Sequence, residues 1–316
     1  MSARTIGYGL ALLVLLAAPL PPLSIYPVLV MKVLCFALFA CAFNLLVGYT
    51  GLLSFGHAVF LGGASYAAGH AMKVWGFPPL FGILFGIVCA AALGYLIGSL
   101  AIRRAGIYFA MITLALAQMM YFVFLQAPFT GGEDGLQAVP RGTLFGLDLT
   151  DDLNLYYVVV AIFVFGFWLI YRTIHSPFGQ ILKAIRENEA RTVSLGYDVT
   201  RFKLLAFVLS AALAGMAGAT KVLVFRFATL TDAHWHTSGE VVLMTLLGGM
   251  GTVFGPVVGA AVVVTLQNEL ADKVGSLVTV IMGIIFVVCV LAFRRGIVGE
   301  VAAFYRRMLG TSRVEH

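Results

Sequence analysis

The chain has 316 residues, of which 61% are hydrophobic and only 11% are charged, and its formal net charge is +6. A soluble domain has roughly 25% charged residues and needs them to cover its surface, so this composition excludes a water-soluble globular protein. The composition indicates a chain that is covered by a lipid bilayer.

Apolar stretches separated by short polar or glycine-rich breaks predict about ten membrane spans. They lie near residues 6–23, 25–47, 53–72, 79–100, 106–126, 153–172, 202–224, 240–254, 256–270 and 276–293. Most approach the ~20 residues that a helix needs to cross ~30 Å of hydrocarbon. Runs such as 10–18 are apolar on every face, which favours helices over barrel strands. The predicted fold class is all-α, a polytopic transmembrane bundle forming one domain over 1–316.

The number of full crossings is predicted only as a range of eight to ten. The spans at 240–254 and 256–270 are short and glycine-broken, so they are candidates for half-helices beside a solute pathway. Residues 6–23 have some features of a secretory signal, with Arg4 before an apolar run. We interpret them as an uncleaved first helix, because no clear small-residue cleavage site leads into a soluble region.

The basic residues are distributed unequally between the two ends of the predicted bundle. With the N-terminus inside, one side holds 14 of the 20 Lys and Arg residues. That side comprises Arg4, Arg103-Arg104, the 172–203 segment and the tail after residue 293. The positive-inside rule then predicts cytoplasmic termini and an outward-facing, acidic 127–152 loop. The net charge follows from this topology and gives no reason to expect nucleic acid as a partner.

The segment 176–200 is predicted to project from the membrane as two short helices. Ser176 and Pro177 are suited to begin the first, which presents Ile181, Leu182 and Ile185 on one side. Asn188 is suited to cap the second, and Gly196 to end it in a left-handed conformation.

Two interpretations of this loop remain open. In the first interpretation the loop lies flat on lipid headgroups through its basic residues. In the second interpretation the loop docks onto a partner. In the second case the small Ala184 and Ala190 permit close approach, while Arg186 and Glu187 fix the orientation.

Three ordered motifs carry a resemblance to a known family. They are NLLVGYTGLLSFGH at 44–57, FGQILKAIRENEA at 178–190 followed by LGY at 195–197 and FKLLAFVLSAALAGMAG at 202–218, and LGGMGTVFGPVVGA at 247–260. Together they cover roughly positions 44 to 295. The chain resembles the permease subunits of bacterial ABC importers for branched-chain amino acids, the LivH/LivM family, and specifically the LivM type.

The resemblance implies a division of labour between subunits. Two permease subunits, here with a LivH-like partner, form the pathway in the inner membrane. Two cytoplasmic LivG/LivF-like ATPases supply energy, and a periplasmic binding protein delivers the solute. The 176–200 segment would be the ATPase-coupling loop, with Ala184, Ile185, Arg186, Glu187, Asn188, Ala190 and Gly196 as its site residues. Relatives also handle urea, short amides and aromatic acids, so the substrate stays open.

Residues that could carry catalytic or cofactor chemistry are few. No G-x-x-x-x-G-K-[ST] phosphate loop occurs in the sequence, so ATP is expected to bind to the partner subunits. The two histidines that flank Trp235, His234 and His236, lack further close ligands and are more typical of an aromatic belt than of a metal site. The four cysteines fall inside apolar spans without paired spacing, as packing residues do. No catalytic, cofactor or metal site is predicted.

Two glycine-rich breaks, at 48–63 and 248–259, interrupt the apolar pattern. Each contains a Phe-Gly pair followed by a small-residue helix, which indicates a weak internal repeat. Interrupted helices in corresponding halves of transporters commonly mark the solute pathway, because broken backbone needs cover from protein or water. A helix N-terminus at such a break could also stabilise a solute carboxylate. The predicted pathway residues are Thr50, Gly51, Ser54, His57, Gly249 and Gly251.

Within this set, Ser54 and His57 are three residues apart and are expected to share one helix face. A purely structural role for the small residues is the alternative, because spacing by four lets helices pack closely in lipid. Such spacing recurs in Gly82/Gly86, Gly94/Gly98, Ala211/Gly215/Ala219 and Gly255/Gly259.

The charged residues near the spans admit more than one interpretation. Lys32 lies inside the second span, where an ionisable group indicates function, although its long stem could extend to the outer interface. Glu240, Glu269, Asp272 and Lys273 lie near span ends and are expected to be solvated.

Two other classes of function agree less well with the sequence than a permease does. A self-contained secondary transporter or channel should carry buried acidic residues, and the predicted spans contain almost none. An intramembrane enzyme using His57 would need a second acid or nucleophile at similar depth; Ser54 is near, but no buried carboxylate accompanies it.

Overall fold

A computed structural model describes residues 26–144, 146–274, 277, 280, 281, 283–285, 287, 288 and 296–300. The predicted first span at 6–23, most of the predicted tenth span at 276–293, Cys289 and both chain ends lie outside these residues.

The described part of the chain is a bundle of helices, which confirms the predicted all-α class. The five helices that are long and apolar enough to cross a membrane are α2 (Pro27–Thr50), α4 (Pro79–Ala101), α5 (Ile107–Gln126), α6 (Asp152–Ile174) and α9 (Val199–Phe225). The remaining α-helices are α3 (Ala58–Lys73), α7 (Pro177–Glu187), α8 (Glu189–Ser194), α10 (Trp235–Gly248) and α11 (Gly255–Val274).

The outer loop between α5 and α6 contains the only described strands. It includes the 3-10 turns η1 (Pro128–Thr130) and η2 (Gly132–Asp134) and the antiparallel pair β1 (Thr143–Leu144) and β2 (Leu147–Asp148). A third 3-10 turn, η3 (Leu230–Ala233), lies between α9 and α10. These pieces are too short to alter the helical architecture.

The structure corrects three of the predicted spans. The third, 53–72, begins only at Ala58 and has 16 helical residues. The eighth, 240–254, is the 14-residue helix α10 followed by a non-helical segment at 249–254. The ninth, predicted as short, extends to 20 residues as α11. The third and eighth spans differ from the prediction because a glycine ends the helix at each break. Gly51, with φ of 78°, ends α2, and Gly249, with φ of 117°, ends α10, both in conformations that glycine adopts readily.

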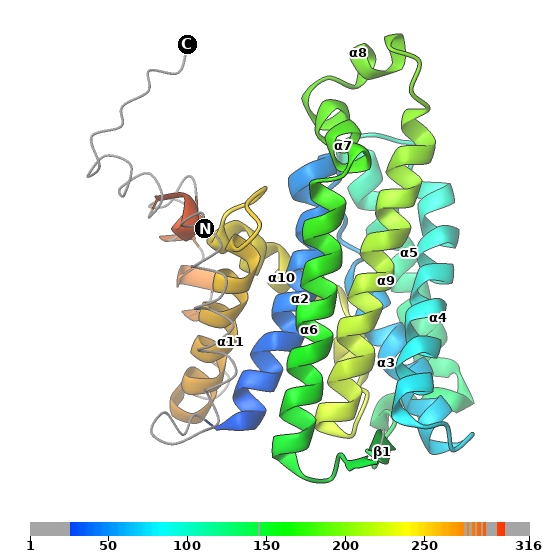
Figure 1. The fold of residues 1–316 in the computed structure, drawn as a ribbon, viewed down its shortest axis with the longest axis vertical. Coiled ribbons are helices and arrows are strands. Elements are labelled where there is room, and N and C mark those ends of the chain that lie inside the picture. Colours follow the sequence, from blue (N-terminus) through cyan, green and yellow to red (C-terminus); the bar gives the residue numbers. More distant parts are fainter. Residues whose placement is uncertain are drawn as a thin grey trace.

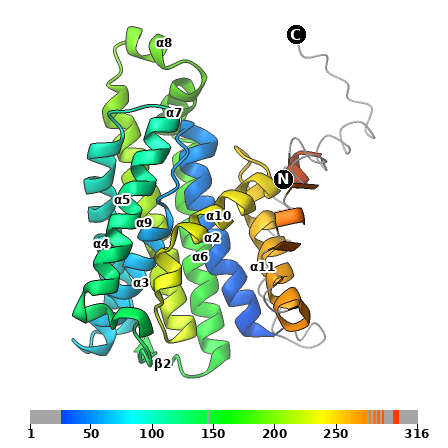
Figure 2. The same cartoon turned by 180° about the vertical axis from the view of Figure 1, so that it is seen from behind.

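Helices α2 and α9 lie at the centre of the bundle, as Figures 1 and 2 show from opposite sides. In each, 67% of the apolar stretch is buried, against 28–33% in α4, α5 and α6. The outer helices expose large side chains such as Phe122, Phe165 and Trp168. Bilayer lipid or a second subunit is the medium that suits such surfaces.

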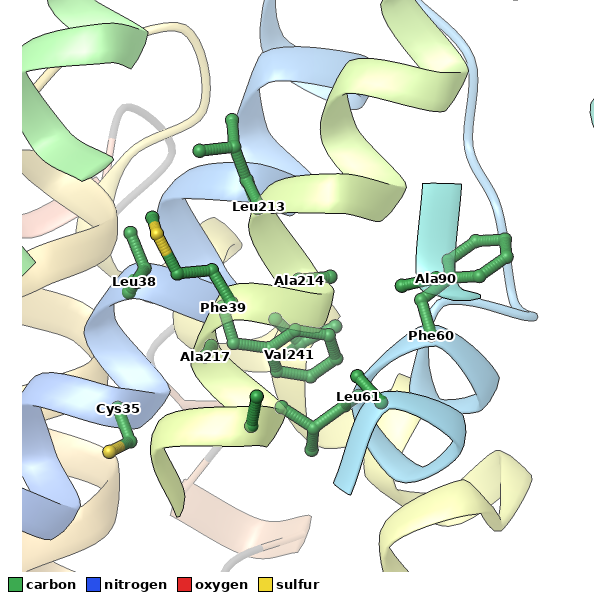
Figure 3. Packing of buried hydrophobic residues seen from close by; sticks show 14 of the residues in the cluster. Cys35, Leu38, Phe39, Phe60, Leu61, Ala90, Leu213, Ala214, Ala217 and Val241 are labelled. Carbon is green, nitrogen blue, oxygen red and sulfur yellow. The ribbon is translucent and has the colours of Figure 1, made fainter. Parts of the chain in front are cut away.

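Small residues bring α3, α4 and α9 close together, as their spacing predicted. A methyl group at Gly86 of α4 would lie 3.1 Å from Cβ of Ala219, and one at Gly215 of α9 would lie 3.3 Å from Cβ of Ala64. Beside this contact, apolar side chains from five helices interlock, among them Phe39, Phe60 and Val241 (Figure 3). Close backbone approach of this kind is the main source of helix association in lipid.

The ends of the bundle agree with the predicted threading. In Figure 1 the α7–α8 segment lies at the same end as the C-terminus of α2, whereas the 127–152 loop lies at the opposite end with the N-terminus of α2. We call these the loop end and the hairpin end.

Replacing Gly215 by Leu should destabilise the bundle, because the new side chain has no room between α9 and its neighbours. Overpacking of this kind costs about 1–3 kcal/mol. The expected result is a lower apparent melting temperature of the detergent-solubilised chain, followed by size-exclusion chromatography. Gly239→Leu is the matched control, since a Cβ at Gly239 of α10 meets no atom within 4 Å. Equal losses in the two variants would contradict the packing argument.

Candidate functional site

The two glycine breaks meet at the loop end of the bundle, where the side chain of Asn44 joins them. Asn44 lies on α2, and its Oδ1 accepts a hydrogen bond of 2.9 Å from the backbone N–H of Gly251. Its Nδ2 donates at 2.9 Å to the carbonyl of Thr252. One buried amide therefore satisfies both a donor and an acceptor of the non-helical 249–254 segment. The spacing between the breaks is equally tight, because a Cβ at Gly48 would lie 2.7 Å from the nitrogen of Gly251.

The 176–200 loop contacts this junction through Arg186 of α7. Its guanidinium Nη1 donates to the carbonyl of Gly48, in the last turn of α2. Carbonyls at a helix C-terminus lack intrahelical partners and attract cations, so an arginine is well suited to this position. A Cβ at Gly251 would lie 3.2 Å from the same Nη1. The predicted loop and pathway residues are thus brought together at one place.

The two short helices of the loop begin and end as the sequence predicted. The Ser176 hydroxyl accepts from the N–H of Gly179, and Asn188 Oδ1 accepts from the N–H of Arg191. Gly196 has a left-handed φ of 89° just after α8. These three confirmed caps explain why the segment folds into compact helices outside the bundle.

The loop is fixed to α9 by a small core and an ion pair. Leu182 and Ile185 of α7 pack against Val199 and Ala206 of α9, with Ile181 partly buried beside them, which confirms the predicted apolar face. The ammonium of Lys203, on α9 and almost fully buried, lies 2.7 Å from the Glu189 carboxylate of α8. These contacts hold the loop against the N-terminal part of α9.

The other predicted loop residues lie around this framework. Ala184 is half-buried, and its carbonyl accepts the N–H of Asn188. Glu187, Asn188, Ala190 and Gly196 are exposed. Glu187 also lines a cavity of about 450 Å³ with Gly48, Tyr49, Lys183, Arg186 and Gly251. Arg186 is exposed as a whole, but its guanidinium reaches the backbone of Gly48 beside this cavity.

The predicted pathway residues of the first break do not all lie at this junction. Thr50 ends α2, and Gly51 follows in a left-handed conformation next to the Arg186 side chain. The chain then returns into the bundle without helical structure, and Ser54 accepts a hydrogen bond from the N–H of Gly56 at 3.3 Å. Ser54 and His57 precede α3, so the prediction that they share a helix face is wrong.

His57 is enclosed at the start of α3, inside the bundle. Its Nε2 lies 2.9 Å from the hydroxyl of Ser210 on α9. That hydroxyl donates its proton to the carbonyl of Ala42, so Nε2 is the donor to Ser210. Four phenylalanine rings surround the imidazole, and its Nδ1 has no partner among the described residues. His57 does not line the cavity beside Arg186, and its role in solute passage stays a prediction.

Sequence reasoning missed three features of the structure. Asn44 was part of a motif but not of the predicted site, since a buried asparagine gives no sign of its partners. Lys221 of α9 forms a buried ion pair with Asp232 of η3, although no acidic residue was predicted to be buried there. The partner of Glu240 was also missed: this residue, in the second turn of α10 and 24% exposed, accepts a hydrogen bond of 2.8 Å from Gln267 of α11.

Long apolar helices, two glycine breaks that meet beside α2, and a charged loop that contacts them are typical of a polytopic membrane transport protein. Residues 28–290 match the family model for the permease component of branched-chain amino acid transport systems, and the chain belongs to that family. Its members are transport permease subunits rather than enzymes.

Several curated relatives resemble the chain. The high-affinity branched-chain amino acid permease LivM of Salmonella typhimurium and that of Escherichia coli are each 29% identical over 72% of this chain. The chain spans 60% of the length of these two relatives. The ribose import permease RbsC of Bacillus subtilis is 27% identical over 91% of both chains. No solved structure gives a significant match.

Replacing Asn44 by Ala should weaken the junction, because it leaves the N–H of Gly251 and the carbonyl of Thr252 without partners. Each unsatisfied buried group costs about 1–3 kcal/mol. We expect a lower melting temperature in detergent and faster proteolysis within 249–254. Asn154→Ala is the control, since Asn154 makes one exposed hydrogen bond to the carbonyl of Asp148. Unchanged melting and proteolysis of Asn44→Ala would contradict the proposed bridge.

Proposed function

We infer that this chain is the permease subunit of an ABC importer that moves branched-chain amino acids inward across the bacterial inner membrane. The single observation that carries this proposal is the contact between Arg186, on the external loop, and Gly48, at the helix break. It links a surface that a motor subunit can reach to the segment where the helices are interrupted. Membership in the permease family supports the same conclusion.

The proposed assembly contains a second, LivH-like permease, two LivG/LivF-like ATPases and a periplasmic binding protein. The loop end then faces the cytoplasm, both termini are cytoplasmic, and ATP binds only to the partners. Arg103 and Arg104 follow the end of α4 that packs against the first turns of α9, next to the 176–200 loop, and this grouping of basic residues supports the orientation.

The free face of the loop supports docking of a protein partner. Val193 and Leu195 at the tip are 55% and 68% exposed, and Tyr197 beside them is 43% exposed. Apolar side chains are costly to leave in water, and these three lie at and just after the end of the short helix α8. An ATPase groove is the proposed partner of this tip, and insertion into lipid headgroups is the alternative.

Uptake by cells tests the proposed function directly. Deleting the gene for this chain should abolish high-affinity uptake of labelled leucine, isoleucine and valine, and expression of the full chain should restore it. Labelled ribose serves as the comparison, because one relative is a ribose permease. Loss of ribose uptake with normal leucine uptake would overturn the assigned substrate class.

Replacing Val193 or Leu195 by Asp should release the ATPase subunits, because the docking tip would carry a charge into an apolar contact. The expected result is loss of ATPase co-purification with the full complex. Thr200→Asp is the control, since an acidic residue is tolerated in the first turn of α9. Normal co-purification in both tip variants, with weaker binding to anionic vesicles, would favour the lipid interpretation.

Replacing Arg186 by Ala should uncouple the loop from the helix breaks and leave the docking tip intact. Uptake and binding-protein stimulation of ATPase activity should fall by roughly tenfold, because a charge-assisted hydrogen bond contributes about 1.5–3 kcal/mol. Glu187→Gln, in the same cavity, should change them in the same direction. ATPase co-purification and solute capture by the binding protein should remain normal.

Arg201→Ala is the matched control for the coupling variants. Arg201 lies in the first turn of α9, is largely exposed, and pairs only with Asp198 three residues away. Wild-type uptake in Arg186→Ala would contradict the coupling role.

A further inference from the structure

A second cavity, of about 720 Å³, lies toward the hairpin end of the bundle. Its walls come from α2, α9, α10 and α11 and from the segment between α9 and α10. Small-molecule sites in proteins usually measure about 300–1,000 Å³. This cavity is therefore of the size that binds a small solute together with water, and it shares none of its lining residues with the cavity at the loop end.

Six ionisable side chains line this cavity, two lysines, two carboxylates and two histidines, and with the histidines neutral their formal charges balance. Lys221 and Asp232 form a buried ion pair with each other and so neutralise one another. Lys32 of α2 and Glu240 of α10 remain, one positive and one negative. The cavity is thus matched in charge to a zwitterion rather than to an anion or a cation.

The two remaining charges are free for a ligand. Within the described residues, Lys32 makes no hydrogen bond or ion pair, although its side chain is only partly exposed. Glu240 accepts one hydrogen bond from Gln267, and His236 Nδ1 lies 3.7 Å from the same carboxylate oxygen. Lys32 and Glu240 stand on different helices and do not pair with each other. A carboxylate has about four lone-pair sites, so Glu240 keeps acceptor capacity for an ammonium group.

Apolar rings complete the chemistry of the cavity. Phe36, Phe225 and Phe227 line it together with the charged groups. Aromatic side chains offer a large apolar surface to an aliphatic group. An amino acid with an aliphatic side chain presents this same combination of carboxylate, ammonium and apolar surface.

We propose that this cavity is a solute site in which Lys32 binds the α-carboxylate and Glu240 binds the α-ammonium of an aliphatic amino acid. Phe36, Phe225 and Phe227 contact its side chain, and the Lys221–Asp232 pair holds the wall between α9 and η3 in place. The proposal rests on the function inferred above and adds to it a binding position within this chain. It also assigns a role to Lys32, for which the sequence left both a functional role and extension to the interface open.

The test compares Lys32→Met and Glu240→Gln in the assembled transporter. Each removes one charge-assisted hydrogen bond, so the maximal rate of leucine uptake should fall about tenfold, which corresponds to ~1.4 kcal/mol. Solute capture by the binding protein and basal ATPase activity should be unchanged. Lys273→Met and Glu269→Gln are the matched controls, because these residues form an exposed pair near the end of α11, outside the cavity.

A binding measurement separates a ligand site from a structural role. Without the binding protein, millimolar leucine should raise the melting temperature of the wild-type complex. The amine-free analogue 4-methylpentanoate and the carboxylate-free analogue isopentylamine should not, and both cavity variants should lose the leucine effect. Equal stabilisation of both variants by leucine would overturn the proposal.

The outcomes also separate this inference from the proposed function. Wild-type uptake of leucine with normal rates in Lys32→Met and Glu240→Gln would overturn the site and leave the function intact. Absence of leucine uptake by the wild-type complex, with uptake of ribose in its place, would overturn the function as well.

Discussion

Lipid supplies no hydrogen bonds, so every break in a membrane helix must find partners for its backbone groups within the protein. The Asn44 amide meets this requirement for the 249–254 segment by accepting from Gly251 and donating to Thr252. Because Asn44 belongs to α2, the same two bonds fix the second break against the first. The position of α10, the direction in which α11 leaves, and the place where Arg186 can reach the backbone all depend on this junction.

Helix α10 connects the two cavities. It begins at Trp235, beside the cavity toward the hairpin end, and ends at Gly248, beside the break at the loop end. Glu240 in its second turn lines the first cavity, and Gly251, just beyond its end, lines the second. Helix α10 has 14 residues, and Asn44 ties the segment that follows it to α2, so α10 and the second break form one connected unit. A movement of α10 would therefore alter both cavities together.

Much of the fold could be predicted from the sequence, because apolar length, caps and small-residue spacing are local signals. Ser176, Asn188 and Gly196 mark the helices of the loop as predicted. The start of α3 was misplaced because residues 53–57 are as apolar as a span, and hydropathy does not distinguish extended chain from helix. Pairings such as Asn44 with Gly251 or Lys221 with Asp232 are set by tertiary packing, and no local sequence pattern predicts them.

The fixation of the loop to α9 has a mechanical consequence. A helix of 27 residues is about 40 Å long. Helix α9 runs without interruption from the 176–200 loop to Lys221, which lines the cavity toward the hairpin end. If the loop tilts by about 5°, the far end of a rigid rod of that length is displaced by about 3.5 Å. That displacement exceeds the length of a hydrogen bond, so a small rotation imposed at one face of the membrane is sufficient to remake contacts near the other.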